Sequence, residues 1–150
     1  MSEITLYKGD CLIEMNKIAD KSVDMILCDL PYGKDSDKTR AKWDSNIDLE
    51  KLKSQFLRIL KDNGTIILFG NEPFSSEVRL CFRNLYKYDY KWIKSKTTGF
   101  ANCNYRPMNK YEDIMIFSRL NASVGGSKNS MLYNPQGLIS VNIEKKNKKK

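Results

Sequence analysis

Four consecutive residues, 29–32, are of types and in an order that could form a binding or catalytic site. They are Asp29, Leu30, Pro31 and Tyr32, and they follow an apolar run at 23–28 that has the length of a buried strand. Residues just past the carboxyl end of a strand are where open α/β sheets bind ligands. The Asp29 carboxylate and nearby backbone carbonyls offer acceptors without donors, which suits an amino group, and a tyrosine ring offers a flat face to an aromatic base. The tetrad therefore predicts a site for a planar ring that bears an exocyclic amine.

The charge of the chain is concentrated at its carboxyl end. The 150 residues, about one domain by length, carry a net charge of +8. The last seven residues, EKKNKKK, hold five lysines and one glutamate and account for half of that charge. Residues 1–143 are therefore only mildly basic, and net charge alone does not establish nucleic-acid binding.

The rare residue types exclude several kinds of site. The sequence has no histidine, and its four cysteines form no CxxC pair. A zinc or other metal site and a histidine-based catalytic machinery are therefore not expected, and the cysteines are expected to be reduced. No apolar stretch approaches roughly 18 residues, and the amino terminus lacks a secretory signal pattern. We therefore expect a cytoplasmic protein without a membrane partner.

Strands and helices that would position the tetrad alternate in the first half of the sequence. Apolar runs predict strands at 3–7, 22–28 and 65–69, and helical spacing of apolar residues predicts helices at 9–20, 48–60 and 75–85. Asn63 or Gly64 is expected to cap the second helix, and a serine to begin the third. This alternation is typical of an α/β fold with a parallel sheet.

The second half of the sequence has a different pattern. Segment 87–95 alternates aromatic and charged residues, and 112–118 contains a continuous apolar run, so we expect an antiparallel pair at one edge of the sheet. Beyond Arg119 the composition shifts to Asn, Ser, Gly and Lys, and the basic tail is expected to be disordered. The expected fold is three or four largely parallel strands with flanking helices, and one sheet edge is expected to lack a neighbour.

The tetrad DLPY resembles the Asp-Pro-Pro-Tyr motif of the S-adenosylmethionine-dependent DNA amino-methyltransferases, with Leu30 in place of the first proline. The surrounding sequence is also similar to the circularly permuted, beta-type group of this family, in which the catalytic half comes first and which is often phage-borne. The resemblance covers residues 4 to about 120 and rests further on LYKGDC, GTIILFG, NEPF and NKYEDIMIFS, with YNPQG at 133–137.

The resemblance implies a partial Rossmann-like methyltransferase sheet and a role for each residue of the tetrad. Asp29 and the backbone carbonyl of Leu30 would accept hydrogen bonds from the target amine, Pro31 would stiffen the turn, and Tyr32 would stack on a base flipped out of the duplex. Asp10 and Asp29 would lie beside the cofactor, S-adenosylmethionine. Aspartate rather than serine at 29 favours adenine N6 over cytosine N4 as the target, and both stay open.

Two basic segments are candidates for contacts with double-stranded DNA. The loop 34–46 and the segment 94–110 interleave cations with aromatic residues, so phosphate contacts and base stacking are expected there. The candidate residues are Lys34, Lys38, Arg40, Lys42, Lys94, Lys96, Arg106 and Lys110.

The chain departs from the family in one respect. The family's glycine-rich cofactor motif follows a strand, whereas the only Gly pair here, in SVGGSKN, follows no strand and opens no helix. We therefore expect residues 1–120 to be a catalytic half, 121–143 to be a loop or the start of a target-recognition region, and 144–150 to be a lysine-rich tail. A partner of this half would be a C-terminal half that supplies the cofactor motif, and the 150 residues alone are expected to be inactive.

Two other functions stay open. The chain could be a non-enzymatic remnant, from a truncated or split enzyme, that binds DNA or a partner. It could also methylate RNA or a protein glutamine amide, because those methyltransferases use similar Pro-Tyr motifs.

Overall fold

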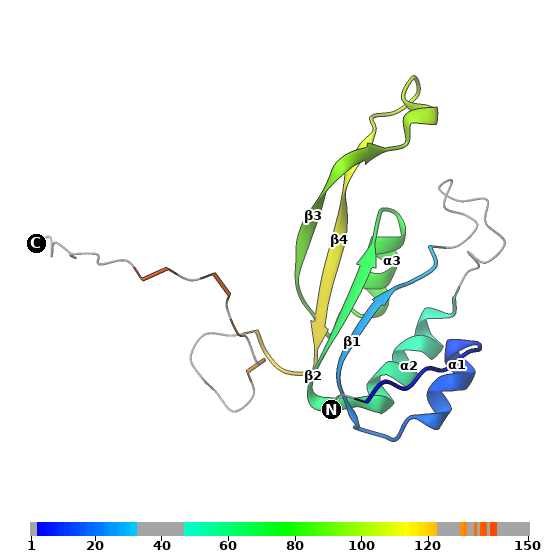
Figure 1. Ribbon diagram of the computed structural model, residues 1–150, viewed down its shortest axis with the longest axis vertical. Helices are drawn as coiled ribbons and strands as arrows, with labels where there is room; N and C mark the ends of the chain where they lie inside the picture. Colours follow the sequence, from blue (N-terminus) through cyan, green and yellow to red (C-terminus); the bar gives the residue numbers. More distant parts are fainter. Residues whose placement is uncertain are drawn as a thin grey trace, which may run out of the picture.

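The computed structural model describes residues 3–32 and 47–122, together with 130, 131, 134, 136, 137, 139 and 140. Its centre is a four-stranded sheet in the order β1-β2-β4-β3 (Figure 1). The strands are β1 (Val23–Asp29), β2 (Leu60–Gly70), β3 (Tyr86–Thr98) and β4 (Asn109–Ser118). The helices are α1 (Cys11–Glu14), α2 (Leu49–Ile59) and α3 (Phe74–Cys81), with 3-10 turns η1 (Met15–Lys17) and η2 (Phe100–Asn102). The mixed α/β class expected from the sequence is confirmed.

The pairing of β1 with β2 confirms one prediction in detail. The two strands are parallel and in register from Met25 opposite Thr65 to Asp29 opposite Phe69. β4 then runs antiparallel to β2, and β3 pairs antiparallel with β4 at the outer edge. The antiparallel edge pair expected from segments 87–95 and 112–118 is therefore also confirmed.

Two expectations about the sheet are wrong. The sheet is not largely parallel, because β3 and β4 form a hairpin and β4 returns beside β2 in the opposite direction. Residues 3–7 are not a strand, and Ile4 and Leu6 are 83% and 89% exposed. Residues 3–7 alternate apolar and polar side chains, but they pair with no described strand. Among the described residues, β1 is paired with β2 alone, and the outer edges of β1 and β3 each lack a neighbouring strand.

The predicted helices are present, but their ends differ from the predictions. α2 begins after Asp48, whose carboxylate accepts a 3.0 Å hydrogen bond from the backbone N–H of Lys51. α2 ends at Ile59 because the chain enters β2 at the next residue, so neither Asn63 nor Gly64 caps it. α3 begins at Phe74 after Pro73 rather than behind a serine cap. The first helix is shorter than predicted and continues as η1.

The core lies between the helices and one face of the sheet. Ile66 and Leu68 of β2 and Phe117 of β4 are fully buried against Leu52 of α2 and Phe82 beyond α3. Burying such side chains is the main stabilising contribution to the fold. None of the described helices is long and apolar enough to cross a membrane.

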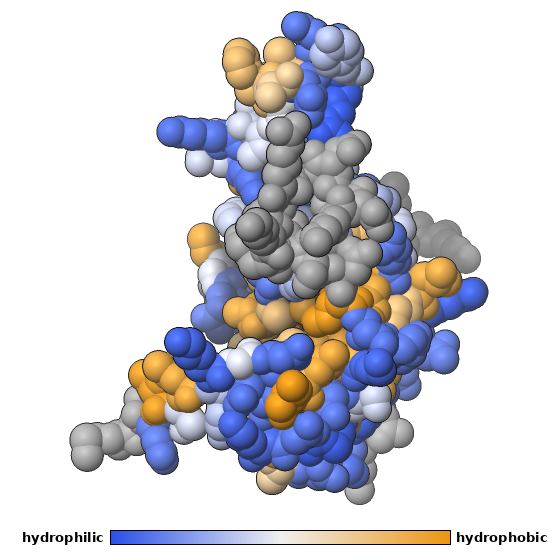
Figure 2. Space-filling view, turned by 90° about the vertical axis from the view of Figure 1, so that its right-hand side faces the viewer, coloured by the Kyte–Doolittle hydropathy of each residue, from blue (hydrophilic) through white to orange (hydrophobic). Residues whose placement is uncertain are grey.

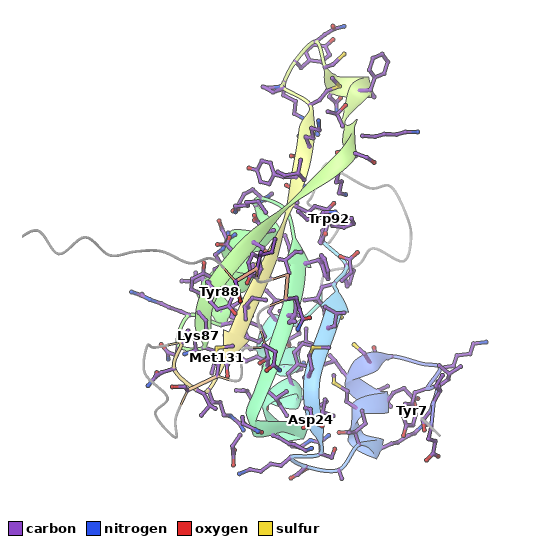
Figure 3. All side chains as sticks on the ribbon, turned by 60° about the vertical axis from the view of Figure 1, so that its left-hand side comes forward. Tyr7, Asp24, Lys87, Tyr88, Trp92 and Met131 are labelled. Atoms are coloured by element: carbon purple, nitrogen blue, oxygen red, sulfur yellow. The ribbon has the colours of Figure 1, made fainter. Side chains whose placement is uncertain are left out.

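The opposite face of the sheet is more open. Side chains alternate across a strand, so Met25 and Leu27 of β1 point away from the helix layer, and they remain 54% and 58% exposed. Tyr88 and Trp92 lie along β3 in Figure 3, and Trp92 is near the level at which the hairpin leaves the sheet. The Trp92 ring meets Phe69 of β2 edge-on, with ring centroids 6.1 Å apart.

Candidate active site and nucleic-acid interface

The tetrad sits where the sequence predicted, at the carboxyl end of β1. Asp29 is the last residue of the strand and its side chain is exposed, whereas Leu30 is only 5% exposed and belongs to the core. Pro31 and Tyr32 are half-buried. The buried Leu30 side chain anchors the turn, so the Asp29 carboxylate is held at the surface by a fixed backbone.

Two contacts with described residues help to position the Tyr32 ring. Its hydroxyl donates a 3.2 Å hydrogen bond to Oδ1 of Asp29, and its ring packs against Phe74 with centroids 5.3 Å apart. Phe74 is the first residue of α3 and is itself buried. The tyrosine is therefore fixed between the end of β1 and the start of α3, and an incoming amine would compete with its hydroxyl for Asp29. Sequence reasoning did not single out Phe74, although the segment NEPF that contains it was part of the resemblance.

Asp10 has a structural role in this arrangement. It precedes α1, and its Oδ1 accepts a 2.8 Å hydrogen bond from the backbone N–H of Leu12. The next residue, Cys11, lies close to Cys28: burial raises the pKa of the Cys28 thiol, and the nearby Cys11 and Asp29 raise it further. Among the described residues, Asp10 accepts a hydrogen bond from Leu12 and Asp29 accepts one from Tyr32, so the two carboxylates have different partners.

The candidate DNA contacts divide into three groups. Lys34, Lys38, Arg40 and Lys42 lie outside the described residues. Lys94 is half-buried in an ion pair with Glu112 of β4, so its charge is already matched. Lys96, Arg106 and Lys110 are exposed and form no ion pair with any described residue.

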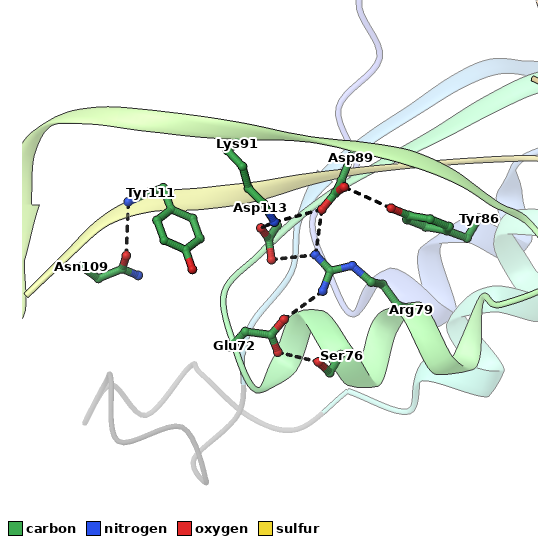
Figure 4. A network of polar contacts seen from close by, with 9 residues as sticks. All are labelled: Glu72, Ser76, Arg79, Tyr86, Asp89, Lys91, Asn109, Tyr111 and Asp113. Atoms are coloured by element: carbon green, nitrogen blue, oxygen red, sulfur yellow. Dashed lines mark hydrogen bonds and ion pairs between the residues drawn. The ribbon is translucent and has the colours of Figure 1, made fainter. Parts of the chain in front are cut away.

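A polar network that the sequence did not reveal lies between α3 and the base of the hairpin (Figure 4). Arg79 of α3 donates to Glu72 at 2.9 Å, to Asp89 of β3 at 3.0 Å and to Asp113 of β4 at 2.8 Å. Lys91 of β3 also binds Asp89 and Asp113. The network joins α3 to both strands of the hairpin.

The charges of this network stabilise one another. Asp113 is only 2% exposed; burial alone would raise its pKa, but hydrogen bonds from Lys91 and Arg79 hold the pKa below its ordinary value. Hydrogen bonds to Asp113 and Asp89 raise the pKa of Lys91. Asp113, Asp89 and Lys91 are therefore charged near neutral pH. Among the described residues, no three His, Cys, Asp or Glu side chains gather where they could hold a metal ion.

The comparisons with known proteins concern the fold. No family model matches the sequence. The structure of PvuII DNA methyltransferase (cytosine-N4-specific) matches with a TM-score of 0.52 at 14% identity, over 75% of this chain and 48% of that chain. The M1.HpyAVI–SAM complex matches with a TM-score of 0.51 at 12% identity, over 87% of this chain and 58% of that chain. This chain therefore shares its fold with part of each of these two proteins. It spans about half the length of these two proteins.

Proposed function

We propose that this chain is the catalytic part of an S-adenosylmethionine-dependent DNA amino-methyltransferase of the permuted, phage-like type. The observation that carries the proposal is the turn at 29–32, where an exposed carboxylate and a fixed aromatic ring stand together at the carboxyl end of β1. Two further observations support the assignment: the fold shared with PvuII DNA methyltransferase, and the position of the DLPY motif at the carboxyl end of β1 in this chain.

In the proposed reaction, the tetrad orients the amine of a flipped-out base. Asp29 and the carbonyl of Leu30 accept hydrogen bonds from its two N–H groups, which turns the nitrogen lone pair toward the methyl donor, and the nitrogen releases one of the two protons to solvent as it gains the methyl group. Pro31 keeps that carbonyl in place, and Tyr32 stacks on the base. We assign adenine N6 as the target because residue 29 is aspartate, with cytosine N4 as the alternative.

Asp10 and Asp29 are the residues we assign to the cofactor, S-adenosylmethionine. S-adenosylmethionine supplies an electrophilic methyl group on a cationic sulfur, and the carboxylates Asp10 and Asp29 suit its positive charges. A glycine-rich loop is the part of such a site that the sequence lacks. We propose that a second α/β unit supplies it by adding a parallel strand to the free edge of β1. Parallel strands are normally covered on both faces, and the exposed Met25 and Leu27 support such docking.

Double-stranded DNA is the proposed substrate, held by the lysines and arginines of the two basic segments. The proposed organisation is residues 1–120 as the catalytic half, 121–143 as a loop or the start of target recognition, and 144–150 as a basic tail. The cysteines of the described segments are all free, which supports a reducing, cytoplasmic compartment.

A methyl-transfer assay tests the proposal. The chain is incubated with tritiated S-adenosylmethionine and mixed-sequence duplex DNA, alone and together with a cofactor-binding unit encoded beside its gene. We expect no transfer by the chain alone and transfer by the pair, with N6-methyladenine found by mass spectrometry of the digested DNA. Detection of N4-methylcytosine would show that the target base is cytosine and not adenine. Tritium on RNA or on a protein glutamine would show that the substrate is not DNA. No transfer by the pair would favour the non-enzymatic remnant.

A further inference from the structure

The β3–β4 hairpin is longer than the sheet to which it belongs. β4 pairs with β2 only from Ser118 to Asp113, where β2 ends at Gly70. Pairing of β3 with β4 continues beyond that point to Thr98 opposite Asn109. Figure 1 shows this two-stranded arm projecting past the carboxyl ends of β1 and β2. At about 3.4 Å per residue, the four residues from Asp113 to Asn109 alone extend it by about 14 Å beyond the level of the tetrad.

The arm is positively charged along its projecting part. Residues 94–110 contain four cations and no acidic residue. Lys94 is neutralised by Glu112, but Lys96, Arg106 and Lys110 have no ion-pair partner among the described residues. A cluster of unmatched cations on a narrow projection is an electrostatic footprint for a polyanion.

The tip of the arm carries groups that can read or stack on bases. Phe100 and Tyr105 are 78% and 89% exposed, and Asn104 and Arg106 are exposed beside them. Figure 2 shows hydrophobic surface next to strongly hydrophilic surface at this tip, at the top of the view. Asparagine and arginine are the side chains that bind adenine and guanine edges through paired hydrogen bonds.

The base of the arm is fixed relative to the tetrad. Arg79 of α3 binds Asp89 on one strand of the arm and Asp113 on the other. The first residue of the same helix, Phe74, packs on Tyr32. A molecule bound along the arm is therefore held at a set distance from the tetrad.

We propose that the β3–β4 arm enters the major groove of duplex DNA beside the target base and reads its sequence. Arg106 and Asn104 contact base edges, and Lys96 and Lys110 contact the flanking phosphates. The major groove of B-form DNA is wide enough for a two-stranded ribbon, whereas that of A-form RNA is too narrow for side chains to read. The inference rests on the proposed function for its substrate, and it gives the arm a share of sequence selection in addition to any target-recognition region that begins at 121–143.

Binding measurements on the 150-residue chain test the arm without requiring methyl transfer. The chain is used to select from a randomised duplex library, and anisotropy titrations on the selected and on scrambled duplexes follow at several salt concentrations. Arg106→Lys keeps the charge but loses the paired hydrogen bonds, so it should lose about tenfold in affinity for the selected duplex and keep its salt slope. Lys96→Gln should weaken binding to both duplexes alike and reduce the slope by about one. Lys61→Gln, at the amino end of β2, is the matched control.

Three results would overturn the inference. The first is an Arg106→Lys variant that binds the selected duplex as tightly as the wild type does. The second is a Lys96→Gln variant whose DNA affinity is no lower than that of Lys61→Gln. The third is equal affinity of the wild type for the selected DNA duplex and for duplex RNA of the same sequence. Failure of the proposed function is a separate result: arm-dependent, sequence-selective DNA binding with no methyl transfer by the complemented protein would refute that function and leave the arm's role standing.

Discussion

Replacing Asp113 by asparagine tests whether the network at the base of the arm stabilises the fold. The side chain is 2% exposed and accepts from Arg79, which is 25% exposed, and from Lys91. Removing one partner of a buried ion pair typically costs about 3–5 kcal/mol. Arg79 keeps Glu72 and Asp89, and an asparagine oxygen still accepts one hydrogen bond, so we expect the free energy of unfolding to fall by about 2 kcal/mol.

Urea denaturation followed by circular dichroism measures this loss. With a typical slope of about 2 kcal/mol per molar, the midpoint should fall by about 1 M. Asp62→Asn is the control, because Asp62 pairs with Lys21 and Arg119 at a surface where it is 67% exposed, and its change should be within error. If Asp113→Asn loses no more stability than Asp62→Asn, the network does not hold the arm.

The same network predicts a pH dependence. The pKa values of Asp113 and Asp89 are lowered from the ordinary 3.8, so their contribution is present above about pH 4 and is lost as the pH falls through the lower, folded-state values. The pKa of Lys91 is raised above 10.5, so its contribution is present below that pH and is lost in stronger alkali. The stability difference between wild type and Asp113→Asn should therefore be full near neutral pH and shrink below pH 4. A difference that stayed constant to pH 2 would contradict this assignment.

Three further predictions follow from burial and charge. Leu52→Ala, at a 1% exposed core position, should lower the free energy of unfolding by about 3 kcal/mol, and Leu80→Ala, at a 72% exposed position, by less than about 0.5 kcal/mol in the same denaturation experiment. Burial raises the pKa of Cys28, so a thiol reagent at neutral pH should modify exposed Cys103 before Cys28, as peptide mass mapping would show. Deleting residues 144–150 should weaken DNA binding and flatten its salt dependence in anisotropy titrations, and an unchanged slope would exclude a role for the tail.

The parts of the fold that follow from local pattern were predictable. The apolar run of β1 and the helical spacing of Leu52 and Phe56 identify their elements because burial is periodic. The false strand at 3–7 has the same kind of pattern, but a strand also needs a neighbour, and the sequence does not say which edges are filled. The antiparallel pairing of β4 with β2 likewise depends on which strands become neighbours in the folded protein, and the local sequence does not determine this.

For the site, too, the features that follow from local sequence could be predicted, and those that depend on folding could not. The position of Asp29 and Tyr32 at a strand end could be predicted, because the motif and the strand adjoin in sequence. The Arg79 network could not, because it joins residues from the β2–α3 turn, α3, β3 and β4 that meet only after folding. Lys94 was a candidate DNA contact, and its pairing with Glu112 depends on a strand register that composition does not reveal.

Single-turnover methyl transfer by the complemented protein tests the central proposal most directly, because it asks whether Asp29 holds the reacting amine. Rates on a duplex that contains the selected site are compared for wild type, Asp29→Ala and the control Asp62→Ala. The proposal predicts that Asp29→Ala lowers the rate by at least about 100-fold, since the lost acceptor acts on the reacting nitrogen, while Asp62→Ala stays within about twofold. An Asp29→Ala protein that transferred methyl groups at close to the wild-type rate would contradict the assignment of the tetrad as the active site.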